Sequence, residues 1–331
     1  MDKKQMLLER LEQAEDFVSG GVLAASLSVT RASVWKYIRE LRNDGYDVEA
    51  VTNRGYRLSP QSDVLTARGV EAALGEQAAQ FEVEVIPECT STNRVLKARA
   101  EELPKWFTLI ACRQSAGQGR NGRTFVSPDR TGLYMSIFLR PELKVSDATL
   151  LTTAAAVAVC RAIRTLAGVR AEIKWVNDVY LHGKKVCGIL TEAGLDMESG
   201  TVKYAILGIG INVTEPEGGF PKEISQIAGA VFEGGARGRR CALAAEVMKE
   251  LYAIVSKLPA RDFVEEYRSL SFVVGQNVQV LRGETGETAF VEDIDAECRL
   301  VVRFLDGRVE KLSSGEVSIR PAGQNGTGAA Q

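Results

Sequence analysis

Histidine is almost absent from this chain of 331 residues, and none of its cysteines forms a close pair. The single histidine, His182, argues against His-based zinc sites, and any Ser-His-Asp triad would have to use it. It lies in a His-Gly-Lys-Lys segment typical of a hairpin turn, which favours an exposed structural role. The six cysteines lie far apart with no C-x-x-C pair, which predicts reduced and mostly buried thiols in a cytoplasmic protein.

Strong net charge and long apolar runs are also missing. The formal net charge is −2, so any contact with nucleic acid must come from a local basic patch. The longest apolar stretch, Ala154 to Cys160, is too short to span a bilayer. The charged N-terminal segment lacks the apolar core of a signal peptide. We therefore expect a cytoplasmic protein of two or three domains that has no membrane partner.

The first 60 residues have the pattern of a winged helix-turn-helix. Thr30 is the expected N-cap of a third helix, in which Val34, Ile38 and Leu41 recur at i, i+4 and i+7. The predicted elements are helices at 3–14 and 22–27, a turn at 28–30, the third helix, and wing strands at 48–51 and 56–58.

Charge within this segment is balanced, with nine Lys and Arg against nine Asp and Glu in residues 1–60. Residues 30–43, however, hold four basic residues and one acidic residue, as expected of a recognition helix. A helical packing module is the alternative. Binding to DNA should be salt-sensitive and weak for a monomer, so we expect a dimer. The candidate DNA-binding residues are Thr30, Arg31, Ser33, Lys36, Arg39 and Arg54.

Beyond residue 65, long helices accompany hairpin-rich strands, which predicts an α+β domain with a mixed, mostly antiparallel sheet. From residue 271 short strands separated by Gly and Asp turns predict a small β-barrel. The expected domains are a DNA-binding domain at 1–60, a catalytic domain at 66–272, a small barrel at 273–321 and a disordered tail at 322–331.

A Gly-rich basic loop at residues 114–123 formally contains G-x-G-x-x-G. A dinucleotide site would need a helix to open at the last glycine, Gly122, but a Thr-Phe-Val-Ser-Pro segment and a predicted strand follow. The glycines instead allow backbone N–H groups to approach an anion, and Arg120 and Arg123 add positive charge. A solvated surface loop is the alternative.

A second stretch, Lys-Trp-Val-Asn-Asp at residues 174–178, leads into a predicted hairpin. The expected hairpin displays Asp178 at one end and Lys185 at the other, and its rigidity suits the positioning of reacting groups. Taken without the other stretches, the segment is equally consistent with an ordinary exposed hairpin. The strand at 207–212 contains two glycines that permit close approach of a ligand, and residues 89–93 form a hydroxyl-rich helix entry.

Together these stretches are similar to the biotin protein ligase family in its bifunctional bacterial form, which is also the biotin operon repressor. The resemblance runs from about residue 5 to residue 320 and includes the order and spacing of the stretches. It implies a winged helix-turn-helix, an α+β ligase domain and an SH3-like C-terminal barrel. The family's loop more often has Arg where this chain has Gln118, and often Trp where it has Phe125. The first difference removes one cation, and the second keeps an aromatic cover.

The resemblance also implies roles for individual residues. Arg120, Lys185 and Asp178 would be catalytic, with Lys185 at the carboxylate and phosphate and Asp178 near the acyl centre. The residues implied for biotin are Ser91, Thr92, Asn93, Gln114, Gln118, Gly119, Arg120, Lys185 and Gly208. Those implied for the nucleotide are Gly117, Arg120, Arg123, Asn177 and Asn212. The sequence does not identify ligands for a metal ion.

The implied reaction joins biotin to ATP, with Mg²⁺, and transfers the biotinyl group from biotinyl-5′-AMP to a lysine of a biotin carboxyl carrier protein of acetyl-CoA carboxylase. The same adenylate would act as corepressor, favouring a homodimer on operator DNA. The alternatives are a ligand-sensing repressor without ligase activity and a ligase with a vestigial DNA module. A lipoate ligase fits the loop and the Lys-Trp-x-Asn-Asp pattern less well.

Overall fold

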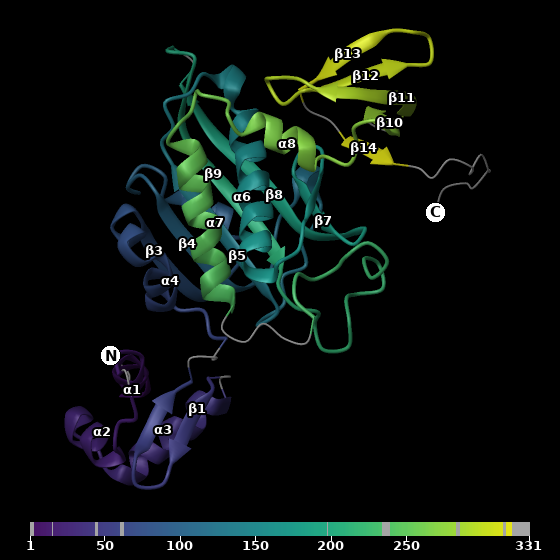
Figure 1. The fold of residues 1–331 in the computed structure, drawn as a ribbon. Helices are drawn as coiled ribbons and strands as arrows, with labels where there is room; N and C mark the ends of the chain where they lie inside the picture. Colours follow the sequence, from purple (N-terminus) through teal and green to yellow (C-terminus); the bar gives the residue numbers. More distant parts are fainter. Residues whose placement is uncertain are drawn as a thin grey trace.

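The computed structural model describes residues 3–14, 16–43, 46–59, 63–196, 198–233, 239–282, 285–313 and 316–319. Three structural parts follow one another along the chain: a small helical part, a large α+β part and a small sheet (Figure 1). The tail expected at 322–331 lies outside the described residues.

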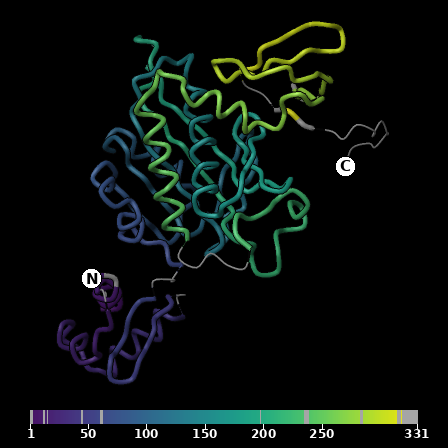
Figure 2. The backbone as a smooth tube through the Cα atoms, in the orientation of Figure 1, coloured from purple at the N-terminus to yellow at the C-terminus, as the bar shows by residue number. Residues whose placement is uncertain are grey.

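The helical part is a winged helix-turn-helix, as predicted. Ser19 caps the second helix by accepting from the Val22 N–H, and Thr30 caps the third by accepting from the Ser33 N–H. Val34, Ile38 and Leu41 are buried, as their spacing predicted. In Figure 2 this part is a separate lobe. Its elements are α1 (Lys3–Glu12), α2 (Gly20–Leu27), α3 (Arg31–Asn43) and the antiparallel wing strands β1 (Val48–Val51) and β2 (Gly55–Leu58).

The large part is built on a seven-stranded mixed sheet with the strand order β3-β4-β5-β9-β8-β7-β6. Among the strands described, β3 and β4 pair in parallel and the other neighbours pair antiparallel. The strands are β3 (Glu82–Cys89), β4 (Phe107–Gln114), β5 (Gly132–Leu139), β6 (Glu172–Lys174), β7 (Asp178–Leu181), β8 (Lys184–Asp196) and β9 (Thr201–Asn212).

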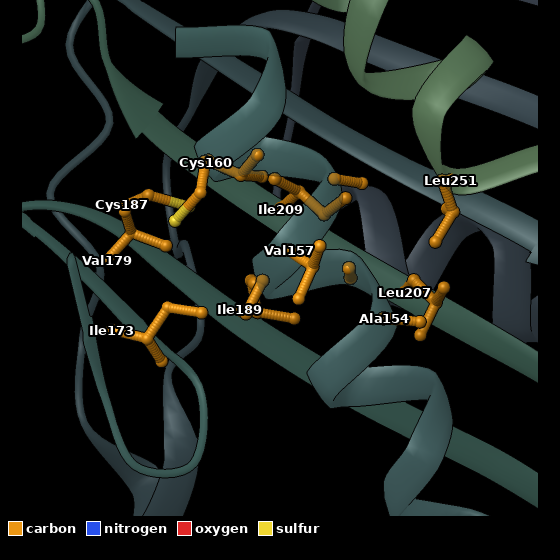
Figure 3. Close-up of a cluster of buried hydrophobic side chains, with 14 of the residues drawn as sticks. Ala154, Val157, Cys160, Ile173, Val179, Cys187, Ile189, Leu207, Ile209 and Leu251 are labelled. Atoms are coloured by element: carbon orange, nitrogen blue, oxygen red, sulfur yellow. The ribbon is translucent and has the colours of Figure 1, made fainter. Parts of the chain in front are cut away.

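One face of this sheet is covered by α6 (Thr149–Ala167), which α7 (Arg239–Val255) packs against. Figure 3 shows Ala154 and Val157 of α6 directed at Leu207 and Ile209 of β9. With its preceding turn, α6 is apolar and long enough to cross a membrane, but 67% of its most apolar window is buried inside the protein. Packing against the sheet therefore accounts for its composition.

The opposite face of the sheet carries a second, smaller core under α5 (Thr92–Ala98). Leu96 of α5 packs there with Phe138 of β5 and Ile206 of β9. Further along β9 on this same face, glycines replace the large side chains, which leaves room above the sheet. The two faces of β9 thus differ in chemistry because successive residues of a strand point to opposite sides.

Further helical segments precede the central sheet or lie between its strands, and α8 (Val264–Leu270) precedes the C-terminal part. The helix α4 (Ala67–Leu74) packs on α7 and was not predicted, although Thr66 caps it and Val70 and Leu74 are buried at i, i+4 spacing. Two 3₁₀ segments, η1 (Gly75–Gln80) and η3 (Val145–Asp147), precede β3 and α6.

The C-terminal part is a five-stranded antiparallel sheet in the order β13-β12-β11-β10-β14. Its strand β14 was not predicted. The Trp175 indole N–H donates to the Cys298 carbonyl oxygen at 2.9 Å, which links this sheet to the central domain. The strands are β10 (Asn277–Arg282), β11 (Thr285–Ile294), β12 (Leu300–Phe304), β13 (Val309–Leu312) and β14 (Glu316–Ile319).

Asp63, which lies between the segments predicted as the first and second domains, is held by the first turn of α7. The Arg240 side chain is 5% exposed and its Nε donates to Asp63 Oδ2 at 2.8 Å. The Arg240 backbone N–H also donates to Asp63 Oδ1. Because both carboxylate oxygens are engaged by Arg240, Asp63 is attached to the central part of the chain.

All six cysteines are free, as expected, and three of them are buried. Burial raises the pKa of the Cys160 thiol to about 12. His182 is exposed at the β7–β8 turn with a positive φ of 51°, so its position agrees with the predicted hairpin turn.

The packing of α6 on the sheet predicts which valines matter for stability. Val157→Ala removes two buried methyl groups and should lower the free energy of unfolding by about 2 kcal/mol. Val145→Ala, at a position 36% exposed beside the same helix, should change it by less than about 0.5 kcal/mol. Urea titrations of the two variants compare these values, and equal losses would contradict the packing described.

Candidate active site

A cavity of about 290 Å³ lies on the sheet face opposite α6. Gly208, Gly210 and Asn212 of β9 line it together with Ile209, whose side chain points to α6 like that of Leu207 (Figure 3). Because residues two apart on a strand are about 7 Å apart, these three positions span about 13 Å along the cavity floor.

The glycines of the floor are required by the side chains that lie over them. A Cβ on Gly208 would be 2.4 Å from Asn93 Oδ1, and one on Gly210 would be 2.6 Å from the Phe125 ring. Both distances are shorter than real Cβ contacts. The absence of a side chain at position 208 therefore makes room for Asn93 at the start of α5. The absence of one at position 210 makes room for Phe125 of the Gly-rich loop.

The Gly208 end of the cavity is polar and uncharged. Ser91, Thr92 and Asn93 are all buried at the start of α5. The Thr92 backbone N–H donates to Gln114 Oε1 at 2.9 Å, and the Thr92 hydroxyl oxygen lies 3.2 Å from the same Gln114 oxygen. Gln114 Nε2 donates to Ser127 Oγ at 3.1 Å. Donors and acceptors are thus held in fixed directions around this end.

The Gly-rich loop folds as an ordered hairpin over the cavity. The Phe125 N–H donates to the Gly117 carbonyl oxygen at 2.9 Å, and the Gly119 N–H donates to the Arg123 carbonyl oxygen at 2.7 Å. A 3₁₀ turn, η2 (Arg120–Gly122), forms its tip. No α-helix opens at Gly122, and the described chain continues into β5 instead, so the exclusion of a dinucleotide-binding fold is confirmed.

Positive charge gathers toward the β7–β8 side. Among the described residues, the charged side chains that line the cavity are four cations and one carboxylate: Arg120, Arg123, Lys174, Lys185 and Asp178. Arg120 Nη1 donates to Asn177 Oδ1 at 3.0 Å, which connects the loop to the β6–β7 turn. Such an excess of cations around a partly enclosed cavity attracts an anionic ligand.

The placement of Asp178 differs from the prediction. Its Oδ1 is 2.7 Å from Lys185 Nζ, so the two groups form an ion pair instead of lying at opposite ends of the hairpin. A bulge between Val179 and Tyr180 shifts the β7–β8 register. This irregularity is not visible in the sequence pattern. Burial, with the nearby Asp178 charge, raises the pKa of Tyr180 to about 12.

The structure brings together almost all of the residues that the sequence singled out for ligand binding. Gly117 does not line the cavity; a Cβ there would be 2.4 Å from the Phe125 carbonyl oxygen, so its role is to let the loop fold back. The predicted residues that line the cavity are Ser91, Thr92, Asn93, Gln114, Gln118, Gly119, Arg120, Arg123, Asn177, Asp178, Lys185, Gly208 and Asn212.

Sequence reasoning missed one wall of the cavity. Ile224, Ile227 and Ala228 lie in an irregular segment whose backbone pairs with Lys185, through Lys185 N–H to the Ile227 carbonyl oxygen and Gly229 N–H to the Lys185 carbonyl oxygen. Val317 of β14 reaches the same cavity from the C-terminal sheet. The i, i+3 spacing of the two isoleucines was the available signal for the first segment.

The candidate DNA-binding residues lie on α3 and the wing. Arg31, Lys36 and Arg39 are exposed, whereas the Thr30 hydroxyl is used as the helix cap. Arg54 is exposed in the wing and pairs with Asp16 at 2.8 Å. The Arg39 guanidinium lies 5.1 Å from the ring centroid of Trp35, which is 55% exposed and was not singled out from the sequence.

Three family models match the chain in order: the HTH domain at residues 3–57, the biotin/lipoate A/B protein ligase family at 85–212 and the biotin protein ligase C-terminal domain at 273–320. The bifunctional ligase/repressor BirA of Escherichia coli is 30% identical over 310 residues, which cover 93% of this chain and 94% of the relative. The Bacillus subtilis protein of that name is 37% identical over 224 residues, 67% of this chain and 68% of the relative.

The chain belongs to the biotin protein ligase family.

A solved member of this family has the same fold. The biotin protein ligase of Aquifex aeolicus, in complex with biotin and ATP, superimposes with a TM-score of 0.60 at 28% identity. The similarity covers 72% of this chain and 98% of the Aquifex chain. This agrees with the prediction of an α+β ligase domain joined to a winged helix-turn-helix and an SH3-like C-terminal domain.

The contact between Gly210 and Phe125 can be tested directly. Gly210→Ala should displace the Phe125 ring and loosen the loop, because the added methyl group would overlap the ring. Trypsin should then cleave after Arg120 and Arg123 at least about threefold faster, since local opening exposes the backbone to proteases. Gly183→Asn, at a turn position where Asn tolerates the positive φ of 75°, is the control. Unchanged cleavage in Gly210→Ala would contradict the contact.

Proposed function

We propose that this ligase condenses biotin with ATP to form biotinyl-5′-AMP and then transfers the biotinyl group to a lysine of a biotin carboxyl carrier protein. The observation that carries the proposal is the polarity of the cavity, which is uncharged at Thr92 and Gln114 and cationic at Arg120 and Lys185. Biotin has the same polarity, with a neutral ureido ring at one end and a carboxylate at the other.

Biotin would therefore lie along β9 with its ring near Gly208 and its carboxylate toward Lys185. The proposed contacts at the ring are Ser91, Thr92 and Gln114. Asn93 serves a different purpose, because its amide is engaged by Leu190, Glu192 and Ser136. Gln118 and Gly119 line the cavity from the loop, so their backbone is the proposed contact.

The nucleotide would occupy the space beyond Gly210, between the loop and the β6–β7 turn. Arg120, Arg123, Asn177 and Asn212 line this part and are the proposed contacts. The carboxylate and the α-phosphate of ATP repel each other, and the side chains of Arg120 and Lys185 would offset that repulsion in the transition state.

Magnesium fits this site as an ion carried by ATP. Within the described residues no group of three or more His, Cys, Asp and Glu side chains could hold a metal ion. The cavity offers one carboxylate, Asp178, and Mg²⁺ typically binds one or two carboxylates together with substrate phosphates and water. Bound in this way, the ion would neutralise phosphate charge.

The transfer step needs a lysine amine in its neutral form, although the ordinary pKa of lysine is about 10.4. Asp178 is the proposed group that orients the incoming amine or accepts its proton. In the structure its carboxylate pairs with Lys185. Lys185 would move to the substrate carboxylate or phosphate, which would release Asp178 for this role. The loop over the cavity would keep the adenylate from water.

The winged helix-turn-helix supports a second role as a biotin-responsive repressor. The exposed basic residues of α3 would enter the major groove, and Arg54 would contact the backbone from the wing. We propose that the adenylate is the corepressor and that the active species is a homodimer on operator DNA. Cytoplasmic location follows from this role. The sequence predicts domains at 1–60, 66–272 and 273–321, and we propose that the second starts at Asp63, because Arg240 of α7 holds that residue.

The ligase activity is tested with radiolabelled biotin, ATP, Mg²⁺ and a biotin-carboxyl-carrier domain. The expected result is pyrophosphate release followed by labelling of one carrier lysine. A repressor without ligase activity would bind biotin and release no pyrophosphate, so this outcome would overturn the proposed reaction.

Arg120→Gly should weaken retention of the adenylate, because the variant loses the cation at the loop tip and the bond to Asn177. Escaped adenylate should biotinylate lysines of a bystander protein such as serum albumin at least about tenfold more than the wild type does. Mass spectrometry of the albumin measures the amount of biotin attached to its lysines. Arg308→Gly removes an arginine from the C-terminal sheet and is the control. Labelling confined to the carrier would reject the role of Arg120.

Asp178→Ala should still form the adenylate but should slow its transfer to the carrier by about 100-fold, the range expected for loss of a general base. Asp178→Asn preserves the shape and should show the same selective loss. Single-turnover assays of each half-reaction provide the comparison. Equal loss in both half-reactions would show that Asp178 acts through Lys185 and not on the amine.

Lys36→Ala should weaken binding to operator DNA and reduce the slope of log K against log salt by about one, because one phosphate contact is lost. The probe is a 40-base-pair duplex selected from a random pool by the wild-type protein in the presence of biotin and ATP. Lys105→Ala changes an exposed lysine of the central domain and should have no effect. An unaltered salt slope in Lys36→Ala would remove this residue from the interface.

A further inference from the structure

A chain of hydrogen bonds runs under the uncharged end of the cavity and ends at residues that do not line it. Ser136 of β5 is fully buried, and its Oγ is 2.6 Å from both Thr92 Oγ1 and Asn93 Oδ1. Asn93 Nδ2 in turn donates to Glu192 Oε2 at 3.0 Å. Neither Ser136 nor Glu192 is among the cavity-lining residues, so they do not touch a ligand there.

The orientation of the Asn93 amide is fixed by its neighbours. Its nitrogen faces two acceptors, the Leu190 carbonyl oxygen at 3.2 Å and the Glu192 carboxylate. Its oxygen must therefore face Ser136, and the Ser136 hydroxyl must act as the donor between them. The absence of a side chain at Gly208 allows this arrangement, because a Cβ there would collide with the same oxygen.

Glu192 is itself anchored from outside. Lys97 Nζ donates to Glu192 Oε1 at 2.9 Å, and this hydrogen bond and the Glu192 charge raise the pKa of Lys97. The chain thus begins at a carboxylate, which is a strong acceptor, and every amide and hydroxyl along it is polarised in one direction.

The direction of the chain decides what Thr92 can offer to a ligand. Ser136 has one proton and donates it to Asn93 Oδ1, so the 2.6 Å contact between Ser136 Oγ and Thr92 Oγ1 requires the Thr92 hydroxyl to be the donor. The Thr92 proton is therefore committed to Ser136, and the lone pairs of the Thr92 oxygen are left to face the cavity. A hydroxyl held in this way complements an N–H donor and repels an acceptor.

We propose that Ser136, held by Asn93 and Glu192, is a positioning residue that sets Thr92 as a hydrogen-bond acceptor for one N–H of the biotin ureido ring. This inference rests on the proposed binding of biotin with its ring at Gly208. It assigns specificity for the ring to residues behind the cavity wall.

The matched pair of variants is Ser136→Ala and Thr108→Val. Thr108 lies on the neighbouring strand β4, is fully buried, and its hydroxyl has no hydrogen-bond partner within the described part of the chain. Ser136→Ala frees the Thr92 hydroxyl to turn and leaves Asn93 Oδ1 without its donor. It should raise the Kd for biotin about tenfold or more, while Thr108→Val leaves it within about twofold. The Kd for ATP should not change in either variant.

The decisive probes are two cyclic carbamate analogues of biotin, each with oxygen in place of a different ureido N–H. Wild-type protein should bind one of them at least about tenfold more weakly than biotin, because an acceptor then faces the Thr92 lone pair. In Ser136→Ala this penalty should shrink about tenfold, since Thr92 can then donate to the ring oxygen. Calorimetric titrations of the intact wild-type and Ser136→Ala proteins with biotin and with each carbamate measure the Kd values that give both penalties.

Equal penalties in wild type and Ser136→Ala would overturn the proposal, as would wild-type protein that binds both carbamates as tightly as biotin. Unchanged biotin affinity in Ser136→Ala would do the same. Absence of any biotin binding by the wild type would instead reject the proposed function, so the two failures are distinguishable. The thermal midpoint of each variant confirms that it is folded.

Discussion

The alternation of β9 is the constraint on which the other features depend. One set of its residues, represented by Leu207 and Ile209, packs on α6 and belongs to the main core. The other set places Gly208, Gly210 and Asn212 under the cavity. Because the strand is clamped by a helix on one side, its floor cannot retreat, and the ligand space exists only as long as the glycines lack side chains.

Two polar systems meet above that floor and have different physical origins. Near α5, neutral groups are oriented by hydrogen bonds that lead back to the buried Ser136. Near β7, Lys185 and Asp178 form an ion pair at a cavity edge. Neutral groups held in fixed directions by hydrogen bonds select a ligand by its shape and by the direction of its hydrogen-bond donors. Cations at the edge of a cavity instead stabilise negative charge that forms during a reaction. In the proposed function, ring recognition and the reaction therefore take place at opposite ends of the cavity.

Much of this arrangement followed from the sequence. Helical spacing at Val34, Ile38 and Leu41 and the cap at Thr30 gave the third helix of the winged domain, because both signals are local. The cavity-lining residues were found through resemblance and spacing. The Asp178–Lys185 pair was not, because it depends on a bulge in the β7–β8 hairpin. Val317 also escaped detection, since nothing local shows that β14 reaches the cavity, and the Ser136 network depends on contacts between distant strands.

The bond between Asp63 and Arg240 has a consequence for dividing the molecule. A chain trimmed to begin at residue 66 would leave a guanidinium only 5% exposed without its carboxylate. An unpaired buried charge typically costs several kcal/mol. A truncated protein without the winged helix-turn-helix should therefore begin upstream of Asp63. If a shorter version loses activity, the cause would be the unpaired Arg240 and not a catalytic need for the winged helix-turn-helix.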